Sequence, residues 1–315
     1  MILFSIVYMF SFYMVVEGND WFIIWLGLEI NMMMFIVIVF ERYSMFNIES
    51  CLSYFFIQSL GSAIFIILFY MEMEYLDFIM CLILGYKMGA GPFFYWFPSV
   101  CSGISWMSCF ILMSIQKLIP LMLISMFISW VFFFVIVFSL LMGVFGSFNQ
   151  NDLKFLMAYS SVYHLGWILL CILIGSMYWF NYLIVYMLMI FPMIYYMMKE
   201  DIVNLMDVIK IKSKFWLITI MLGVAGMPPF LGFFLKWFAF SVIMNYSIFY
   251  MIVLILCSVI MFYVYFRIIY DVLVSYFCFS GWGSWSLESE NMFWLDFFCM
   301  IGMLFGFCIG VYLVF

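Results

Sequence analysis

Apolar residues form long runs along the chain, and short stretches rich in polar residues, glycine or proline separate one run from the next. A helix that crosses a membrane needs about 20 mostly apolar residues. Cutting the chain at its polar and Gly/Pro clusters predicts eleven such helices. They cover Met1–Val16, Trp21–Phe40, Cys51–Tyr70, Phe78–Phe97, Gly103–Ser125, Met126–Gly146, Asn151–Ile174, Trp179–Met198, Lys214–Ile243, Ser247–Asp271 and Phe293–Val314.

The composition of the chain agrees with this pattern. Hydrophobic residues make up 70% of the 315 residues and charged residues only 8%, with a mean hydropathy of +1.29. A soluble domain is about 45–50% apolar and roughly 25% charged. We therefore expect an all-α polytopic membrane protein with almost no mass left for a soluble domain.

The sequence lacks the motifs that bind several common cofactors and partners. The nine cysteines include no C-x-x-C pair, so neither a metal site nor an iron–sulfur centre is expected. Gly281 and Gly283 are not followed by the third glycine of a dinucleotide-binding turn, and no strand precedes them. The net charge is −6 and no basic patch suits a nucleic acid.

The positions of the basic residues predict how the chain crosses the membrane. Of the 10 lysines and arginines, three lie deep inside predicted spans and the other seven lie in loops or near span ends. With eleven spans, all the others fall on the side of the N-terminus, whereas the opposite loops carry acidic residues such as Glu17 and Glu72. Lys and Arg concentrate on the cytoplasmic or matrix side. The N-terminus is therefore expected on that side and the C-terminus on the other.

Four ionisable side chains, Glu29, Lys87, Lys117 and Lys236, lie well inside predicted spans. A charge at the bilayer centre costs at least ~2.5–3.5 kcal/mol, and such residues usually pair, line a wet cavity or relay ions. Glu29 and Lys87 are eight and nine residues into their spans, a depth of roughly 12–14 Å at the helical rise. Lys117 and the single histidine, His164, have similar depths. This common depth predicts a lateral row of polar groups, which Gln58 could extend.

Two of the spans that carry these lysines contain helix-breaking sequences. Gly89–Pro92 follows Lys87, and Gly226–Pro229 precedes Lys236. Proline removes a backbone donor and clashes with the preceding turn, and irregular backbone inside a membrane is tolerated only within protein or beside a cavity. Ordinary proline kinks with snorkelling lysines are the alternative, but snorkelling serves residues near helix ends.

The two broken spans also occupy matching places, because they are the fourth of one set of five and the fourth of the next. Since five is odd, the two sets enter the membrane from opposite sides, as in inverted-repeat transporters. The prediction is two inverted five-helix repeats, residues 1–125 and 126–271, each with a broken helix. Residues 272–315 would add a loop and one extra helix.

Six segments of the chain carry recognisable motifs. They are Trp25–Asn31, Tyr54–Gln58, Lys87–Val100, Gln116–Pro120, Asn149–Trp167 and Gly226–Trp237. Taken in order, these segments resemble the NADH dehydrogenase subunit 2 family of mitochondrial respiratory complex I, one of the antiporter-like subunit families. Any one of these motifs is weak, but six in the family's order are specific. The resemblance covers nearly the whole chain except roughly residues 272–292.

The resemblance implies the family's fold, location and function. The fold would be inverted five-helix repeats in the shorter, animal mitochondrial form. The chain would be a non-redox, multi-pass subunit of the inner membrane with a matrix-side N-terminus, among other membrane-arm subunits and lipids. It would move protons coupled to quinone reduction. NADH, FMN, iron–sulfur clusters and ubiquinone would bind other subunits, with no cofactor or metal in this chain.

The resemblance also implies roles for the interior residues. Glu29 and Lys87 would form the switching pair of the first half, because burial favours a neutral lysine whereas a nearby carboxylate favours the ammonium. Lys117 would pass the proton along the row, and Lys236 would be the terminal lysine. His164 is either a relay or a satisfied core residue.

Two residues depart from the family's usual pattern. Phe94 stands where the family usually has histidine, and Ser99 where it usually has an acid. If that histidine relays protons in relatives, a water molecule or Tyr95 would have to serve here. Two other functions stay open, an autonomous cation/proton antiporter and a structural subunit that conducts nothing.

Overall fold

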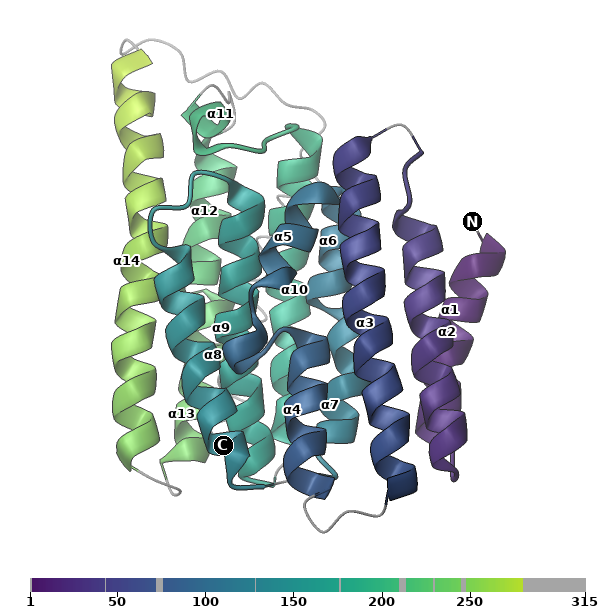
Figure 1. Ribbon diagram of the computed structural model, residues 1–315. Helices are drawn as coiled ribbons and strands as arrows, with labels where there is room; N and C mark the ends of the chain where they lie inside the picture. The colour runs from purple at the N-terminus through teal and green to yellow at the C-terminus, as the bar shows by residue number, and fades with distance from the viewer. Residues whose placement is uncertain are drawn as a thin grey trace. The chain divides into compact units, whose positions relative to one another are not determined.

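The computed structural model describes residues 2–279, apart from 43, 72–75, 128, 176, 210–213, 229 and 245–247 (Figure 1). These residues form helices and loops, with one isolated bridge between Asp152 and Asn204. The described helices are α1 (Ile2–Glu17), α2 (Trp21–Val39), α3 (Met45–Met71), α4 (Leu76–Met88), η1 (Gly91–Phe93), α5 (Trp96–Gly103), α6 (Trp106–Met113), η2 (Ile115–Lys117), α7 (Leu118–Ile124), α8 (Val131–Ser147), α9 (Leu153–Leu173), α10 (Tyr178–Lys199), α11 (Leu205–Ile209), α12 (Lys214–Ala225), α13 (Leu231–Ile243) and α14 (Ile248–Phe279).

The prediction of an all-helical chain built for a membrane is confirmed over the described residues. Seven helices there are long and apolar enough to cross a bilayer, and four shorter helices are also apolar. The predicted span Lys214–Ile243 consists of two helices, α12 and α13. The predicted span Phe293–Val314 lies outside the described residues, so the count of eleven and the inverted repeats stay predictions.

The chain divides into two compact units. Unit 1 consists of Met1–Gly143 with Met157–Leu169, and unit 2 consists of Val144–Leu156 with the chain from Leu170 onward. Within unit 1, α2 packs between α1 and α3, and α3 also packs against α4 and α5. Within unit 2, α10 and α14 both pack against α12 and α13. The predicted repeat boundaries concern internal symmetry, which this division by compactness does not test.

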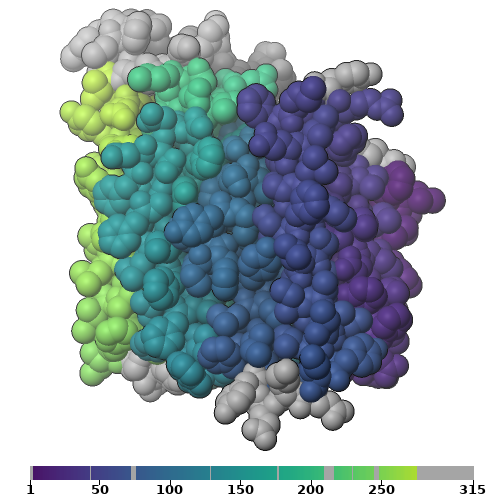
Figure 2. All heavy atoms as spheres, viewed as in Figure 1, coloured from purple at the N-terminus to yellow at the C-terminus, as the bar shows by residue number. Residues whose placement is uncertain are grey.

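Helix α3 illustrates how these helices place polar groups. Its outward side chains are apolar and exposed, and in Figure 2 its indigo atoms cover part of the outside of unit 1. Its buried face instead carries Gln58 and Ser62. A soluble amphipathic helix has the opposite arrangement. Apolar side chains therefore face the surroundings and hydrogen-bonding groups face the interior, as a helix surrounded by lipid requires. The exposed set is Leu52, Phe56, Leu60, Ile64 and Ile67.

One close approach between α8 and α9 inside unit 1 depends on a missing side chain. A Cβ atom on Gly143 would lie 2.6 Å from the backbone nitrogen of Tyr163 and 2.8 Å from its Cα. Both obstructing atoms belong to the backbone, so the contact cannot be relieved by a rotamer change. Two helices meet here at a distance that only glycine permits.

We expect Gly143→Ala to destabilise the protein by about 1–3 kcal/mol or more, because overpacking at a backbone contact forces the helices apart. The thermal unfolding midpoint in mild detergent measures the effect. Gly85→Ala is the matched control, since its Cβ would meet only Val135 Cγ1 at 3.6 Å. Equal midpoints for the two variants would contradict the assigned role of Gly143.

Candidate functional site

Lys87 lies at the point where α4 ends inside unit 1. Its side chain is buried, and the following Gly89 and Gly91 take φ values of +68° and +61°, which glycine adopts without strain. In a continuous helix the Lys87 carbonyl would accept a bond from residue 91. Here it accepts one from Gln58 Nε2 at 2.8 Å instead. The predicted break therefore occurs, and a side chain from α3 satisfies the backbone group that it releases.

One turn of α3 contacts both members of the predicted Glu29–Lys87 pair. A Cβ on Gly61 would lie 3.0 Å from Cγ and Cε of Lys87, so the lysine side chain runs along this glycine. The adjacent Ser62 donates its hydroxyl to Glu29 Oε1. Glu29 is half-buried on α2. The acid and the lysine thus meet the same turn of α3.

Lys117 belongs to a further helix break, between α6 and α7, that the sequence did not predict. Helix α6 ends at Met113, and η2 carries Lys117 into the start of α7. The lysine is 2% exposed, and its ammonium donates to the Ser161 carbonyl at 3.1 Å. It also lies 4.8 Å from the ring centre of Phe97, a cation–π distance. Pro120 is the sequence feature that could have predicted this break. Proline has no backbone N–H, so it cannot donate the hydrogen bond that the carbonyl of residue 116 would accept in a regular helix.

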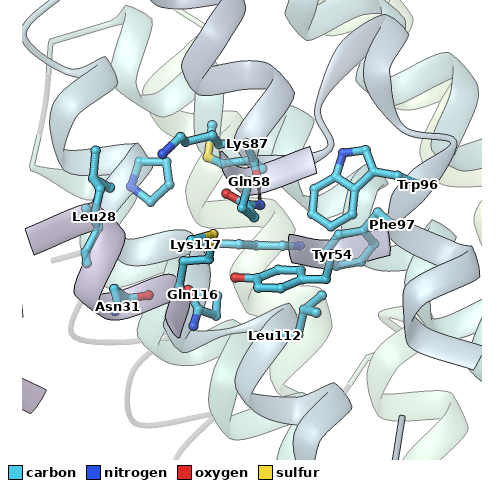
Figure 3. Close-up of a pocket in the computed structure, with 14 residues that line it drawn as sticks. Leu28, Asn31, Tyr54, Gln58, Lys87, Trp96, Phe97, Leu112, Gln116 and Lys117 are labelled. Carbon is cyan, nitrogen blue, oxygen red and sulfur yellow. Dashed lines mark hydrogen bonds between the residues drawn. The ribbon is translucent and has the colours of Figure 1, made fainter. Parts of the chain in front are cut away.

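A cavity of about 30 Å³ in unit 1 connects these groups. Lys87, Gln58 and Lys117 follow one another along it in Figure 3, together with Asn31 and Gln116. The Gln116 Nε2 atom is buried and has no hydrogen-bond partner among the described residues. A volume of this size has room for roughly two water molecules, and polar walls are what buried water requires.

His164 lies on α9, three residues after Ser161, whose carbonyl binds Lys117. It is 2% exposed, and its ring centre is 5.3 Å from that of Tyr163. His164 therefore lies one helical turn from the residue whose carbonyl binds Lys117, and its predicted place in the polar row stays a prediction. Its two predicted roles, relay or core residue, both fit this position.

Lys236 lies in unit 2, on the second half of the other broken helix. Its ammonium donates to the Ala225 carbonyl at 2.8 Å, the last residue of α12. Gly226 follows with φ +85°, a common way for a helix to end. A cation at a helix C-terminus also complements the helix dipole. Lys236 thus caps the helix that ends before it, whereas Lys87 precedes its own break.

Phe94 stands where the family usually has histidine, and its neighbours in the structure are aromatic. Phe94 is buried, with ring centres 4.1 Å from Tyr95 and 6.1 Å from Tyr159. Tyr95 is 73% exposed and belongs to the outer surface of unit 1. Tyr159 of α9 is half-buried beside Phe94, so it is a second hydroxyl near this position.

Glu29 and Lys87 thus meet at one turn of α3, and Lys87 and Lys117 line one cavity. His164 lies one helical turn from the residue whose carbonyl binds Lys117. Lys236 belongs to the other unit. The sequence reasoning included Gln58 but missed Ser62, although Ser62 lies four residues further along and therefore on the same helix face. Within the described part of the chain, no three His, Cys, Asp or Glu side chains gather as a metal site would need.

Comparison with known proteins gives concordant matches. Residues 67–262 match the transmembrane family model described as NADH:quinone oxidoreductase/Mrp antiporter. NADH-ubiquinone oxidoreductase chain 2 of Anopheles gambiae is 33% identical over 302 residues, 89% of this chain and 88% of that protein. The protein of the same name from Rhipicephalus sanguineus is 32% identical over 90% of this chain and 93% of its own length.

Solved structures show a similar fold at low sequence identity. A chain of respiratory complex I from Thermus thermophilus superposes with a TM-score of 0.81 at 19% identity, covering 98% of this chain and 77% of that one. A chain of an archaeal membrane-bound sulfane sulfur reductase gives 0.77 at 16% identity, covering 98% and 73%. At such identities the likeness concerns the fold alone.

We expect Gln58→Leu to loosen the break after Lys87, because a buried carbonyl without its donor costs about 1–3 kcal/mol. That range corresponds to roughly five- to 150-fold faster amide hydrogen exchange for residues 88–91. Hydrogen-exchange mass spectrometry in detergent measures it. Ser59→Ala is the control on the same helix, since its exposed hydroxyl binds only the Phe56 carbonyl. Unchanged exchange in Gln58→Leu would contradict the prediction.

Proposed function

The chain belongs to the NADH:quinone oxidoreductase/Mrp antiporter family of membrane proteins, and on this premise we propose that it is a proton-moving membrane-arm subunit of respiratory complex I. The relatives named above support a multi-pass subunit of the mitochondrial inner membrane. The chain would not itself carry electrons. NADH oxidation and quinone reduction on other subunits would reach it as a conformational or electrostatic change.

The observation that carries this proposal is the arrangement of two buried lysines on one polar cavity. Water molecules in that cavity would bridge Lys87 and Lys117, with Gln58 and Gln116 as fixed hydrogen-bonding groups. A proton would pass from the ammonium of one lysine through water to the neutral amine of the other. The apolar surroundings keep the neutral form accessible, since burial disfavours the charge.

Glu29 would switch the proton affinity of Lys87. A carboxylate that approaches favours the ammonium, and one that withdraws releases the proton. In a medium of low effective dielectric, a small change of distance has a large effect on this interaction. The break supplies the movable part, because Gly89 and Gly91 allow the end of α4 to reorient without rebuilding the helix.

The remaining predicted features belong to the same proposal. Lys117 would pass the proton onward, Lys236 would be the terminal lysine of the second half, and His164 would be a relay or a core residue. Eleven helices in two inverted repeats, with a matrix-side N-terminus and an opposite C-terminus, are the proposed topology. Other membrane-arm subunits and lipids would surround the chain.

Two other functions make different predictions. An autonomous cation/proton antiporter would work as an isolated chain. A structural subunit would need an intact fold but no titratable lysines. Buried lysines beside a polar cavity favour proton movement over a scaffold role, because a scaffold has no use for the energetic cost of burying them.

We expect Lys87→Met and Lys236→Met to abolish proton pumping driven by NADH while the complex still assembles. Methionine keeps most of the side-chain volume but cannot carry a proton. The number of protons moved per electron, in vesicles containing the purified complex, measures the effect. Lys199→Met, an exposed lysine at the end of α10, is the control and should pump normally. Normal pumping in both the Lys87→Met and the Lys236→Met variants would leave the scaffold function standing.

Purification in mild detergent distinguishes the antiporter alternative. We expect the chain to appear only within a very large complex, since its membrane-arm neighbours would cover part of its apolar surface. Native gel electrophoresis with a tag on the chain measures its size. Recovery of the isolated chain with cation/proton exchange in vesicles would overturn the proposed function.

A further inference from the structure

Ser62 has a hydroxyl with two acceptors and only one proton to give. Its Oγ contacts Glu29 Oε1 on α2, and it also reaches the Ser59 carbonyl of its own helix at 3.0 Å. Ser62 is 1% exposed, so solvent does not compete for either contact. Most serines in these helices bond only to a carbonyl three or four residues back, as Ser53 does. The additional contact with an ionisable group on another helix distinguishes Ser62.

We propose that Ser62 is a positioning residue that holds the Glu29 carboxyl group against α3 in both of its protonation states. The inference rests on the proposed proton movement and deepens it. When Glu29 is ionised, the Ser62 hydroxyl donates to the carboxylate. When Glu29 is protonated, its O–H donates to Ser62 Oγ, and the serine proton turns to the Ser59 carbonyl. The hydroxyl proton stays on its oxygen throughout, so Ser62 carries no proton itself.

The neighbouring glycine explains why the position of Glu29 matters. Lys87 runs along Gly61, and Ser62 is the next residue of the same helix. One turn of α3 therefore sets the separation between the acid and the lysine. Without the serine, no hydroxyl would fix the carboxylate at this separation, and its attraction to the Lys87 ammonium would vary with its position. Ser62 holds the carboxylate at a distance where its attraction is strong enough to favour protonation of Lys87 and weak enough to let Lys87 give the proton up again.

Other titratable groups surround this turn and have to be separated from Glu29 in any test. Lys87 and Tyr86, both of α4, contact the Gly61 position of this turn. Lys117 of η2 and the phenols of Tyr8 and Tyr54 belong to the same unit. A measurement that reports the Glu29 carboxyl group directly is therefore needed. The infrared C=O stretch of a protonated carboxylic acid is such a signal, and Glu29→Gln identifies it because the band then disappears.

The test compares Ser62→Ala with Ser62→Thr in the assembled complex. In Ser62→Ala the Glu29 band should move to higher wavenumber, because its carboxyl group loses a hydrogen bond. Removing a donor to the carboxylate also makes protonation easier, so the acid limb of the pumping profile should move up by roughly one pH unit. Ser62→Thr keeps the hydroxyl and should restore both properties. Ser53→Ala on the same helix should change neither, since its hydroxyl binds only the Ser50 carbonyl.

A band and a pH profile that stay unchanged in Ser62→Ala would overturn the proposal. Should the complex with Ser62→Ala fail to assemble, Ser62→Cys supplies a weaker donor of similar size. It should shift the Glu29 band and the pH profile in the same directions by smaller amounts. If neither property shifts in Ser62→Cys, the proposal is equally overturned. Failure of the proposed function looks different. In that case Lys87→Met and Glu29→Gln would pump normally, whereas the Glu29 band would still respond to Ser62→Ala.

Discussion

A broken helix inside an apolar medium must find partners for the backbone groups that it releases, and much of this structure follows from that constraint. Water is not available in the hydrocarbon region, so each such group needs a side chain or a polar cavity. After Lys87 the partner is Gln58, which binds the released carbonyl at 2.8 Å. At the end of α12 the partner is Lys236 itself, which binds the Ala225 carbonyl at 2.8 Å. The polar groups that complete the helices are also the groups proposed to handle protons.

The two broken helices use their lysines differently. Lys87 precedes its break, and its side chain lines the cavity while Gln58 satisfies its carbonyl. Lys236 follows its break, and its ammonium is a cap for the preceding half-helix. A change in the charge or position of Lys236 therefore also changes how α12 ends, whereas Lys87 can change its proton without losing a backbone cap. In the proposed function, Lys87 can therefore gain and lose a proton without a change in its helix, whereas a change in the protonation of Lys236 also changes the end of α12.

Glycine and proline marked two breaks in the sequence because their effects are local. Gly89 and Gly91 adopt positive φ, and proline lacks the N–H that a helix needs, whatever surrounds them. The third break, between α6 and α7, has no glycine, so only Pro120 hinted at it. Its consequence is the placing of Lys117 in η2, where the ammonium reaches Ser161 on a distant part of the chain. That contact depends on how α9 packs within unit 1, which no local pattern specifies.

The sequence alone determined the all-helical membrane character, the burial of Lys87 and Lys117 and the two glycine- and proline-marked breaks. Hydropathy and backbone stereochemistry decide these properties residue by residue. The partners of the buried groups came only from the tertiary structure. Ser62 and Gln58 look like ordinary polar residues of an apolar helix until α3 packs between Glu29 and Lys87. Hydrogen bonds act over about 3 Å, so which groups meet depends on helix rotation and spacing, and these result from packing of the whole unit.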